Sequence, residues 1–322
     1  MTTVKYLYGR RVKVVVETST GSTTFENKQT PNNSWAIQFN IPFSDSSTPS
    51  TCTVTIMNLS AKNRSLFKVG RTVKVYAGYA EDGTGLISSG AIRSTTPYTS
   101  DGVNTTFTFT YREGDEYANA ESSAEKANDK LEAARKKQEK AIGKKAAAKL
   151  PKIKKHSALS FGKNSKAETI IRRIAKDAGI KISGIYLKKN NTYRKGFTCH
   201  GKPLSNIQTI AKACGSQVYY RRGQVYIDDL SKKLGHQETV LITDHISGNG
   251  GGTGLIQYPT TSSETNEAKH KTWEVVSLLR YQISTGSVVT VRNKFLNGTF
   301  RVKSGTHVCD DSAFTTTMEV YV

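Results

Sequence analysis

The chain has 322 residues, enough for two or three domains that each have a hydrophobic core. It carries 47 Lys and Arg against 26 Asp and Glu, a net charge of +21, so we expect an acidic neighbour. It contains no run of eighteen apolar residues and no apolar stretch in residues 1–11, so we expect neither a transmembrane helix nor a secretory signal. Cys52, Cys199, Cys214 and Cys309 are far apart and are expected to be reduced thiols.

Residues 1–113 are predicted to form an N-terminal β domain. Apolar and polar residues alternate in 12–16, 35–41, 52–56 and 105–111, which is the period of a strand with one buried face. About seven such segments, separated by turns, favour a barrel or a sandwich.

Residues 114–156 interrupt this pattern and are predicted to be a long charged helical insertion or linker. From Ala118 to Leu150 there is no proline and one glycine, and residues with high helix propensity predominate. At about 1.5 Å per residue such a helix is roughly 50 Å long, and Pro151 ends it.

A heptad seam composed mainly of alanine runs along this predicted helix. Its positions are Ala124, Ala127, Leu131, Ala134, Gln138, Ala141, Lys145 and Ala148. Such small side chains bury too little area to form an independent core. We therefore expect a solvated or partly frayed helix. The alternatives are a helix that packs on a partner or on copies of itself, and a nucleic-acid-binding segment.

Residues 157–234 contain an internal repeat and are predicted to form a small α+β domain. The pattern Ile-x-x-Ile-Ala-Lys-x-x-Gly occurs at 171–179 and again at 207–215, an offset of 36 residues. Each copy predicts a short amphipathic helix closed by a left-handed glycine and followed by β structure.

Local signals in this domain predict where its helices and one hairpin lie. Ser165 with Glu168 three residues later has the spacing of a capping box. The second helix is expected to start after Pro203, with Ser205 available as its cap, and Arg222-Gly223 is expected to form a hairpin turn.

Residues 235–322 are predicted to form a C-terminal β domain. The glycine-rich loop 248–254 lacks the order of a phosphate-binding loop, and Asn297-Gly298 has the composition of a hairpin turn. Three segments are predicted as strands: 273–279, 287–291 and 314–322.

The sequence contains no enzyme or metal motif that predicts a catalytic, cofactor-binding or metal-ligating residue. The six histidines show neither HxxxH nor HExxH spacing: His156, His200, His236, His245, His270 and His307. Two combinations contain zinc-ligand residue types without the spacing of a finger or ribbon, namely Cys199-His200 with Cys214, and His307 with Cys309. Asp244-His245 and Asp310-Asp311 are expected to cap turns, and there is no GxSxG motif. We therefore expect no enzyme activity and no cofactor.

Several motifs, taken in order, resemble phage tail and baseplate hub proteins of the tail-tube-like kind. Those in the N-terminal part are residues 39–43, 52–60, 70–79 and 86–92. Those in the C-terminal part are residues 253–256, 277–279, 286–291 and 297–302, with His307. The insertion at 114–156 is not part of this resemblance.

The resemblance implies a fold and an assembly. The fold is α+β and mostly β, with two tube-like β-barrel or sandwich domains that flank the small α+β domain. Three chains would form a pseudo-hexameric ring that joins a hexameric tail tube to a three-fold tip or spike. The location is then the virion tail, after assembly in the host cytoplasm.

The same resemblance implies the partners. They are a tail-tube or distal tail protein above, a tip or spike protein below, a tape-measure protein, and genome DNA in transit through the channel. The charge and the paired helix-strand units leave one alternative, a cell-wall or polyanion-binding module.

Overall fold

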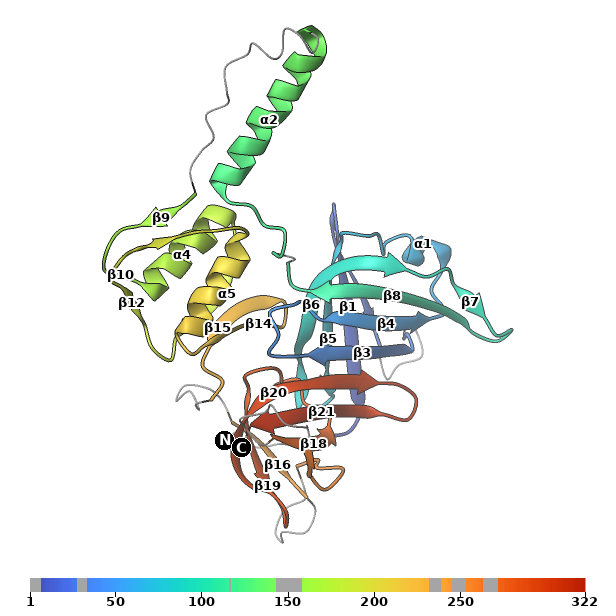
Figure 1. The fold of residues 1–322 in the computed structure, drawn as a ribbon. Coiled ribbons are helices and arrows are strands. Elements are labelled where there is room, and N and C mark those ends of the chain that lie inside the picture. The colour runs from blue at the N-terminus through green and yellow to red at the C-terminus, as the bar shows by residue number, and fades with distance from the viewer. Residues whose placement is uncertain are drawn as a thin grey trace.

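The computed structural model describes residues 7–27, 34–115, 117–142, 158–231, 239–244, 253–262 and 272–321. Most of the ordered elements are strands, and the helices are concentrated in one region beside them (Figure 1). The predicted class, α+β and mostly β, is confirmed. No helix in these ranges has both the length and the apolar character needed to cross a membrane.

The N-terminal β region is an antiparallel array with the strand order β3-β4-β8-β6-β5-β1-β2. Its elements are β1 (Arg10–Thr18), β2 (Gly21–Glu26), β3 (Ile37–Phe43), β4 (Thr51–Met57), α1 (Ala61–Arg64), β5 (Thr72–Tyr79), β6 (Gly83–Thr95), β7 (Thr99–Ser100) and β8 (Thr105–Glu113). Burial alternates along β4 and β8 as the sequence predicts, so one face of each strand packs in the core. Ser60 caps α1 by accepting a hydrogen bond from the Asn63 backbone N–H at 3.2 Å.

The C-terminal β region is built around one long strand, β20 (Asn297–Cys309). Its other strands are β16 (Thr239–Thr243), β17 (Thr260–Ser262), β18 (Thr272–Leu278), β19 (Val288–Arg292) and β21 (Phe314–Tyr321). Residues 297–301 of β20 pair with β19, and residues 301–309 pair with β21, with a register shift between Val302 and Ser304.

The predicted turn at Asn297-Gly298 is wrong. These two residues begin β20, where Gly298 pairs with Val291. The turn lies at residues 293–296, because the Asn293 side-chain oxygen accepts hydrogen bonds from the Phe295 and Leu296 backbone N–H groups, both at 2.7 Å.

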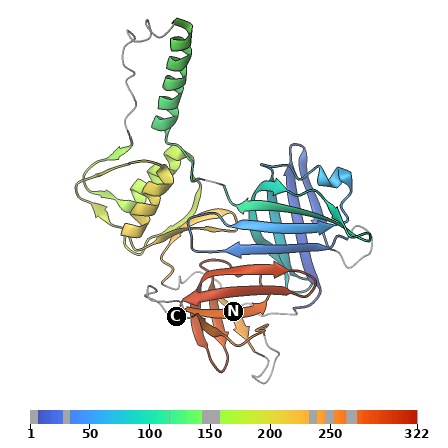
Figure 2. The same ribbon diagram turned by 45° about the vertical axis from the view of Figure 1, so that its right-hand side comes forward.

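The second half of β20 pairs with β3 and joins the two β regions into one 14-stranded sheet (Figure 2). The pairing is antiparallel and runs from Gly305 opposite Phe43 to Cys309 opposite Phe39. The hydrophobic cores also interlock. Cys309 and Phe314 pack with the N-terminal core, whereas Phe43 packs with the C-terminal one.

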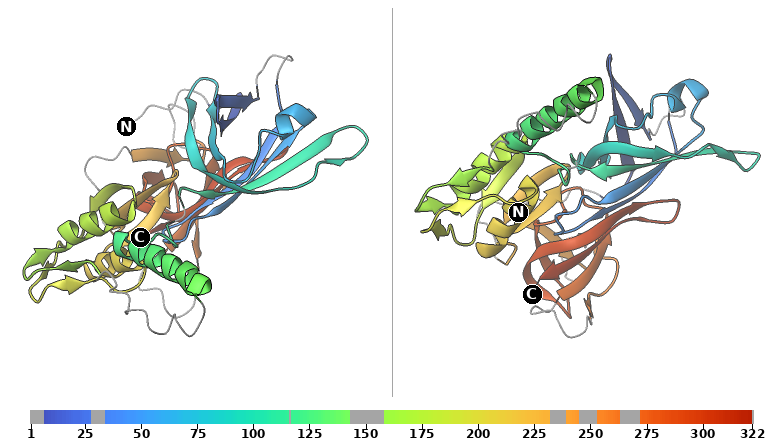
Figure 3. Two further views of the ribbon diagram at one scale, coloured as in Figure 1. Left: turned by 90° about the horizontal axis from the view of Figure 1, so that it is seen from above. Right: turned by 45° about the horizontal axis from the view of Figure 1, so that its top comes forward.

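The middle region lies to one side of this sheet (Figure 3). Its elements are β9 (Ser160–Phe161), β10 (Ser165–Lys166), α4 (Ala167–Ala178), β11 (Ile182–Tyr186), β12 (Thr192–Tyr193), β13 (Phe197–Thr198), α5 (Pro203–Ala213), β14 (Gln217–Arg221) and β15 (Gln224–Asp228). The two helices share one apolar core with the sheet β11-β15-β14. Gly179 and Gly215 have φ values of +74° and +70°, which confirms the predicted left-handed glycines.

Both predicted helix starts in this region are wrong. The Ser165 hydroxyl donates to the Gly162 carbonyl, and the Glu168 backbone N–H instead donates to the Asn190 side chain at 3.1 Å. Helix α5 begins at Pro203 itself, where the missing N–H costs nothing because first-turn N–H groups have no partner within the helix.

The insertion contains α2 (Ser123–Ile142), a 20-residue helix that projects away from the body (Figure 1). It starts five residues later than predicted, because Ser122 and Glu125 form a capping box with hydrogen bonds of 2.8 and 3.2 Å. Residues 143–150 of the predicted helix lie outside the described ranges.

We predict that Gly305→Ala weakens the junction of β20 with β3. A Cβ at Gly305 would overlap the Thr317 carbonyl oxygen and lie 2.6 Å from Phe43 Cζ. Overpacking of this kind costs about 1–3 kcal/mol, which denaturant unfolding measures. Gly162→Ala is the control, because nothing lies within 4 Å of its added Cβ. Equal stability of the two variants would show that the junction tolerates the methyl group.

Candidate functional site

His307, on β20, is buried and bonded through both ring nitrogens. Nδ1 lies 2.9 Å from Thr316 Oγ1, and Nε2 lies 3.1 Å from the Ile283 carbonyl oxygen. Burial lowers the pKa of His307 to about 3, so the ring is neutral at physiological pH. A carbonyl oxygen only accepts, so Nε2 carries the proton and donates it. His307 therefore orders the β20–β21 pair.

Two of the cysteines named as possible zinc ligands, Cys199 and Cys309, have surroundings that disfavour the thiolate. The Cys309 thiol donates to the Ile37 carbonyl at 3.4 Å, and burial raises its pKa to about 12. Burial also raises the pKa of Cys199 to about 11. All four cysteines are free, and no three His, Cys, Asp or Glu side chains in the described part of the chain meet as a metal site.

Within the predicted turn at Asp310-Asp311, one of the two acidic residues acts as the cap. Asp310 caps its turn, since its Oδ1 accepts from the Ser312 and Ala313 backbone N–H groups at 2.8 and 2.6 Å. Asp311 instead accepts from the Gln38 side chain on β3 at 3.1 Å. His245, beside Asp244, lies outside the described residues, as do His156, His236 and His270.

The best candidate site is the place where the middle region meets both β regions. The hairpin of β14 and β15 turns at Arg222 and Gly223, with φ values of +53° and +85°. The Arg222 guanidinium donates to the Tyr281 carbonyl at 2.6 Å, and Arg221 donates to Ser287 Oγ at 3.3 Å. The predicted hairpin is thus confirmed, and its tip is inserted between the two β regions.

Glycines allow this close approach. A Cβ on Gly223 would lie 2.7 Å from the Ser89 carbonyl oxygen on β6. One on Gly286 would lie 2.5 Å from the Tyr219 hydroxyl. The hairpin therefore packs directly against backbone from both β regions.

Glu113, the last residue of β8, binds the hairpin tip from the N-terminal side. Its carboxylate accepts the Gly223 backbone N–H at 3.1 Å. Burial raises the pKa of Glu113 to about 7, although the Gly223 and Arg222 backbone N–H groups and the Arg222 charge oppose the rise. Burial also lowers the pKa of Arg222 to about 10. This carboxyl group consequently titrates near neutral pH.

Asp228 and Arg301 form a buried ion pair on the C-terminal side. Arg301 Nη2 donates to Asp228 Oδ2 at 2.5 Å, and both side chains are almost completely buried. Burial raises the pKa of Asp228 despite the opposing charge of Arg301. The pair connects β15 of the middle region to β20.

The sequence did not predict that Glu113, Asp228 and Arg301 form this junction. A sequence signal exists for one of the three. Glu113 continues the buried alternation of Phe107, Phe109 and Tyr111, so an acidic residue occupies a core-facing position. Asp228 and Arg301 became a pair only through tertiary folding.

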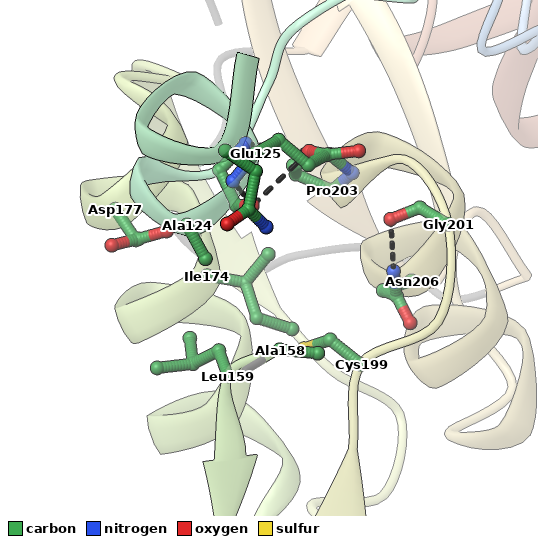
Figure 4. A pocket seen from close by; sticks show the side chains of 12 residues that line it. Ala124, Glu125, Ala158, Leu159, Ile174, Asp177, Cys199, Gly201, Pro203 and Asn206 are labelled. Carbon is green, nitrogen blue, oxygen red and sulfur yellow. Dashed lines mark hydrogen bonds between the residues drawn. The ribbon is translucent and has the colours of Figure 1, made fainter. Parts of the chain in front are cut away.

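The base of α2 contains a second feature, a cavity of about 170 Å³ between α2, α4 and α5 (Figure 4). Leu159, Ile174 and Pro203 form its apolar wall. The Asp177 carboxylate accepts the Ser123 backbone N–H at 3.0 Å, and Asn206 donates to the Gly201 and Lys202 carbonyls. These polar groups bind the chain's own backbone. The hydrogen bond between Asp177 and Ser123 fixes the start of α2.

We predict that Glu113→Gln removes one component of the pH dependence of stability. A carboxyl pKa raised from 4.5 to about 7 contributes stability that is complete below pH 4.5 and is lost as pH rises to 7. The loss amounts to about 3 kcal/mol at 1.36 kcal/mol per pKa unit. Denaturant unfolding between pH 4.5 and 8 should show a smaller fall for this variant, whereas Glu274→Gln, at an exposed site on β18, should follow the wild type. Parallel curves for wild type and Glu113→Gln would contradict the assignment.

We predict that Arg301→Met destabilises the fold by about 3–5 kcal/mol, because it leaves Asp228 buried without its counter-ion. Adding Asp228→Asn should recover much of this loss. Lys303→Met is the matched control on the same strand, since its half-exposed pair with Glu319 contributes only about 0–1 kcal/mol. Similar unfolding free energies for Arg301→Met and Lys303→Met would show that burial of the first pair is unimportant.

No protein-family model matches the chain, and no curated protein matches it in sequence. Solved structures do match it. The tail protein from Neisseria meningitidis MC58 aligns with a TM-score of 0.56 at 11% identity, over 98% of this chain and 97% of that one. The 43 kDa tail protein of prophage MuSo2 from Shewanella oneidensis aligns with a TM-score of 0.54 at 12% identity, over 96% of each chain.

A third match is the E. coli c3393 protein, with a TM-score of 0.50 at 7% identity over 90% of this chain and 75% of that one. It is a component of the type VI secretion system with structural similarity to T4 bacteriophage tail proteins gp27 and gp5. The expected resemblance to phage tail hub proteins is confirmed at the level of the fold, which this chain shares with phage tail proteins over nearly its whole length.

Proposed function

We propose that this protein is a structural subunit of the tail-tip or baseplate hub of a phage or phage-like particle, and that it acts without enzyme activity. The observation that carries the proposal is the pairing of β3 with β20, which places two β regions side by side in one sheet. Three such chains provide six β regions around one axis. A ring of this kind adapts a hexameric tube to a three-fold tip.

The free sheet edges support closure by repeated head-to-tail contacts. Among the described strands, β2 and β17 end the main path of the sheet, one in each β region. A head-to-tail interface joins two different surfaces of the same chain and closes when the rotation between copies divides a full turn. Pairing of β17 of one copy with β2 of the next would cover both edges.

The proposed hub has partners on both faces. A tail-tube or distal tail protein lies above it, and a tip or spike protein lies below. The tape-measure protein and the genome pass through its channel, for which a net charge of +21 is favourable. This function places the protein in the virion tail, after assembly in the host cytoplasm.

We expect the purified protein to form a trimer of three 35.3 kDa chains, about 106 kDa in all. Light scattering after size-exclusion chromatography measures the mass, and electron microscopy should show a three-fold ring with a central hole. A monomer that binds cell-wall material or DNA, with affinity that falls steeply as salt rises, would support the alternative of a polyanion-binding module.

A further inference from the structure

The positive charge of the chain is concentrated in the middle region. Residues 158–231 contain 14 Lys and Arg against 4 Asp and Glu, a net charge of +10. The described residues of the N-terminal β region have 10 basic against 8 acidic side chains, and those of the C-terminal β region have 5 against 5. Residues 178–227 contain no Asp or Glu, although the average of 26 in 322 would place about four there. The middle region is therefore the part of the described chain that attracts an anion most strongly.

The few acidic residues of the middle region do little to neutralise its surface. Asp228 and Asp229 are buried, with exposed fractions of 1% and 7%. Glu168 is paired with Arg172 on the same helix, and the Asp177 carboxylate accepts a backbone N–H at the start of α2. The surface of this region is consequently almost entirely basic.

Two short strand pairs of the middle region form a ribbon that brings exposed cations together. Strand β9 pairs with β13, and β10 pairs with β12. Between the two pairs the Asn164 backbone N–H donates to the Tyr193 carbonyl at 2.9 Å, so residues 163–166 lie alongside residues 192–195. The ribbon lies on the side of the middle region away from the β regions (Figures 1 and 2). We call its four exposed cations the basic ribbon: Lys163, Lys166, Arg194 and Lys195.

The charges of the basic ribbon are not neutralised by the described part of the chain. None of its four side chains forms an ion pair with another described residue. Like charges on neighbouring strands repel one another and destabilise the pairing. An anion that carries several charges and binds across the ribbon would relieve this repulsion.

The exposed side of the ribbon is polar as well as basic. Its aromatic side chains, Phe161, Tyr193 and Phe197, pack against the core of the middle region. The positions exposed between the cations include an amide, Asn164, and a hydroxyl, Thr192. Interfaces between proteins depend on buried aromatic and aliphatic anchors, whereas phosphate groups are bound by Lys, Arg, Asn and Thr side chains. The ribbon therefore fits a phosphate backbone better than it fits an acidic protein.

We propose that the basic ribbon is a contact surface for the phosphate backbone of double-stranded DNA, bound through charge and not through base sequence. A two-stranded ribbon is narrow enough to enter the major groove, which places its cations beside the phosphates. The duplex carries one negative charge per about 1.7 Å of its axis, so several cations can be neutralised at once. In the proposed hub this DNA is the genome in transit. The identity of the occupant thus rests on the proposed function, whereas the surface itself does not.

Fluorescence anisotropy with the full-length protein and a labelled duplex of about 20 base pairs tests the proposal. Four phosphate contacts release counterions, so raising salt from about 50 to about 200 mM should weaken binding at least about a hundredfold. The ribbon variant carries Lys163→Gln, Lys166→Gln, Arg194→Gln and Lys195→Gln. It should bind more weakly at low salt, and its plot of log affinity against log salt should be shallower by about 3.6.

A matched control removes the same charge from the β regions. Lys62→Gln, Lys68→Gln, Arg292→Gln and Lys294→Gln change three lysines and one arginine at exposed positions, as the ribbon variant does. This control should keep the wild-type salt dependence. Equal losses in the two variants would show that only net charge matters, and would overturn the ribbon as the contact surface. A ribbon variant that binds the duplex like the wild type would overturn it too.

Competition identifies the anion that the ribbon prefers. Unlabelled duplex, poly-glutamate and a poly(glycerol phosphate) wall polymer are each added at the same concentration of charge. The unlabelled duplex should displace the labelled one best. Stronger displacement by poly-glutamate or by the wall polymer would assign the ribbon to an acidic protein or to the cell wall, and would overturn DNA as its occupant.

Failure of this proposal can be distinguished from failure of the proposed hub. A trimer of 35.3 kDa chains whose duplex binding is unchanged in the ribbon variant overturns the contact surface and leaves the hub intact. A monomer whose duplex binding is lost in the ribbon variant supports the surface and overturns the hub.

Discussion

The architecture depends on the backbone hydrogen bonds between β3 and β20. Each strand, alone, would be the edge of its own β region and would expose a row of unpaired N–H and C=O groups. Pairing them over five residue positions satisfies both edges and fixes the angle between the regions. Because Phe43 and Phe314 then each pack in the core of the other region, the two parts form one rigid unit.

The polar contacts of the β14–β15 hairpin fix the orientation of the middle region on the two β regions more than they stabilise the fold. Burying the charges of Glu113, Arg222, Asp228 and Arg301 costs desolvation energy that their contacts only partly offset. Moving the hairpin would break the hydrogen bond between Glu113 and Gly223 and the ion pair between Asp228 and Arg301. The polar junction thus restricts the middle region to one orientation, which a subunit must have if identical contacts are to close a ring.

The elements that sequence analysis predicted correctly are those whose signal is local. Alternating apolar and polar residues predict β4 and β8, whose burial alternates in the same way, and the glycines at 179 and 215 end helices wherever those helices pack. Local signals failed where another group competed. Ser165 donates its hydroxyl to Gly162, so Asn190 caps the helix instead.

Local sequence signals could not predict the candidate site, because its residues come from distant parts of the chain. Asp228 and Arg301 are 73 residues apart, and Glu113 and Gly223 are 110 apart. The β3–β20 register, likewise, pairs residues more than 260 positions apart. Only Glu113 could have been predicted as a buried acidic residue, because it continues the alternation of Phe107, Phe109 and Tyr111 on the buried face of β8.

The rigidity of the junction has a consequence for the proposed assembly. Among the described strands, β2 and β17 end the main path of the sheet, one in each β region, and the β3–β20 pairing holds them in a fixed relation. Each subunit of the proposed ring would therefore meet the next at the same angle, which a head-to-tail interface needs if it is to close.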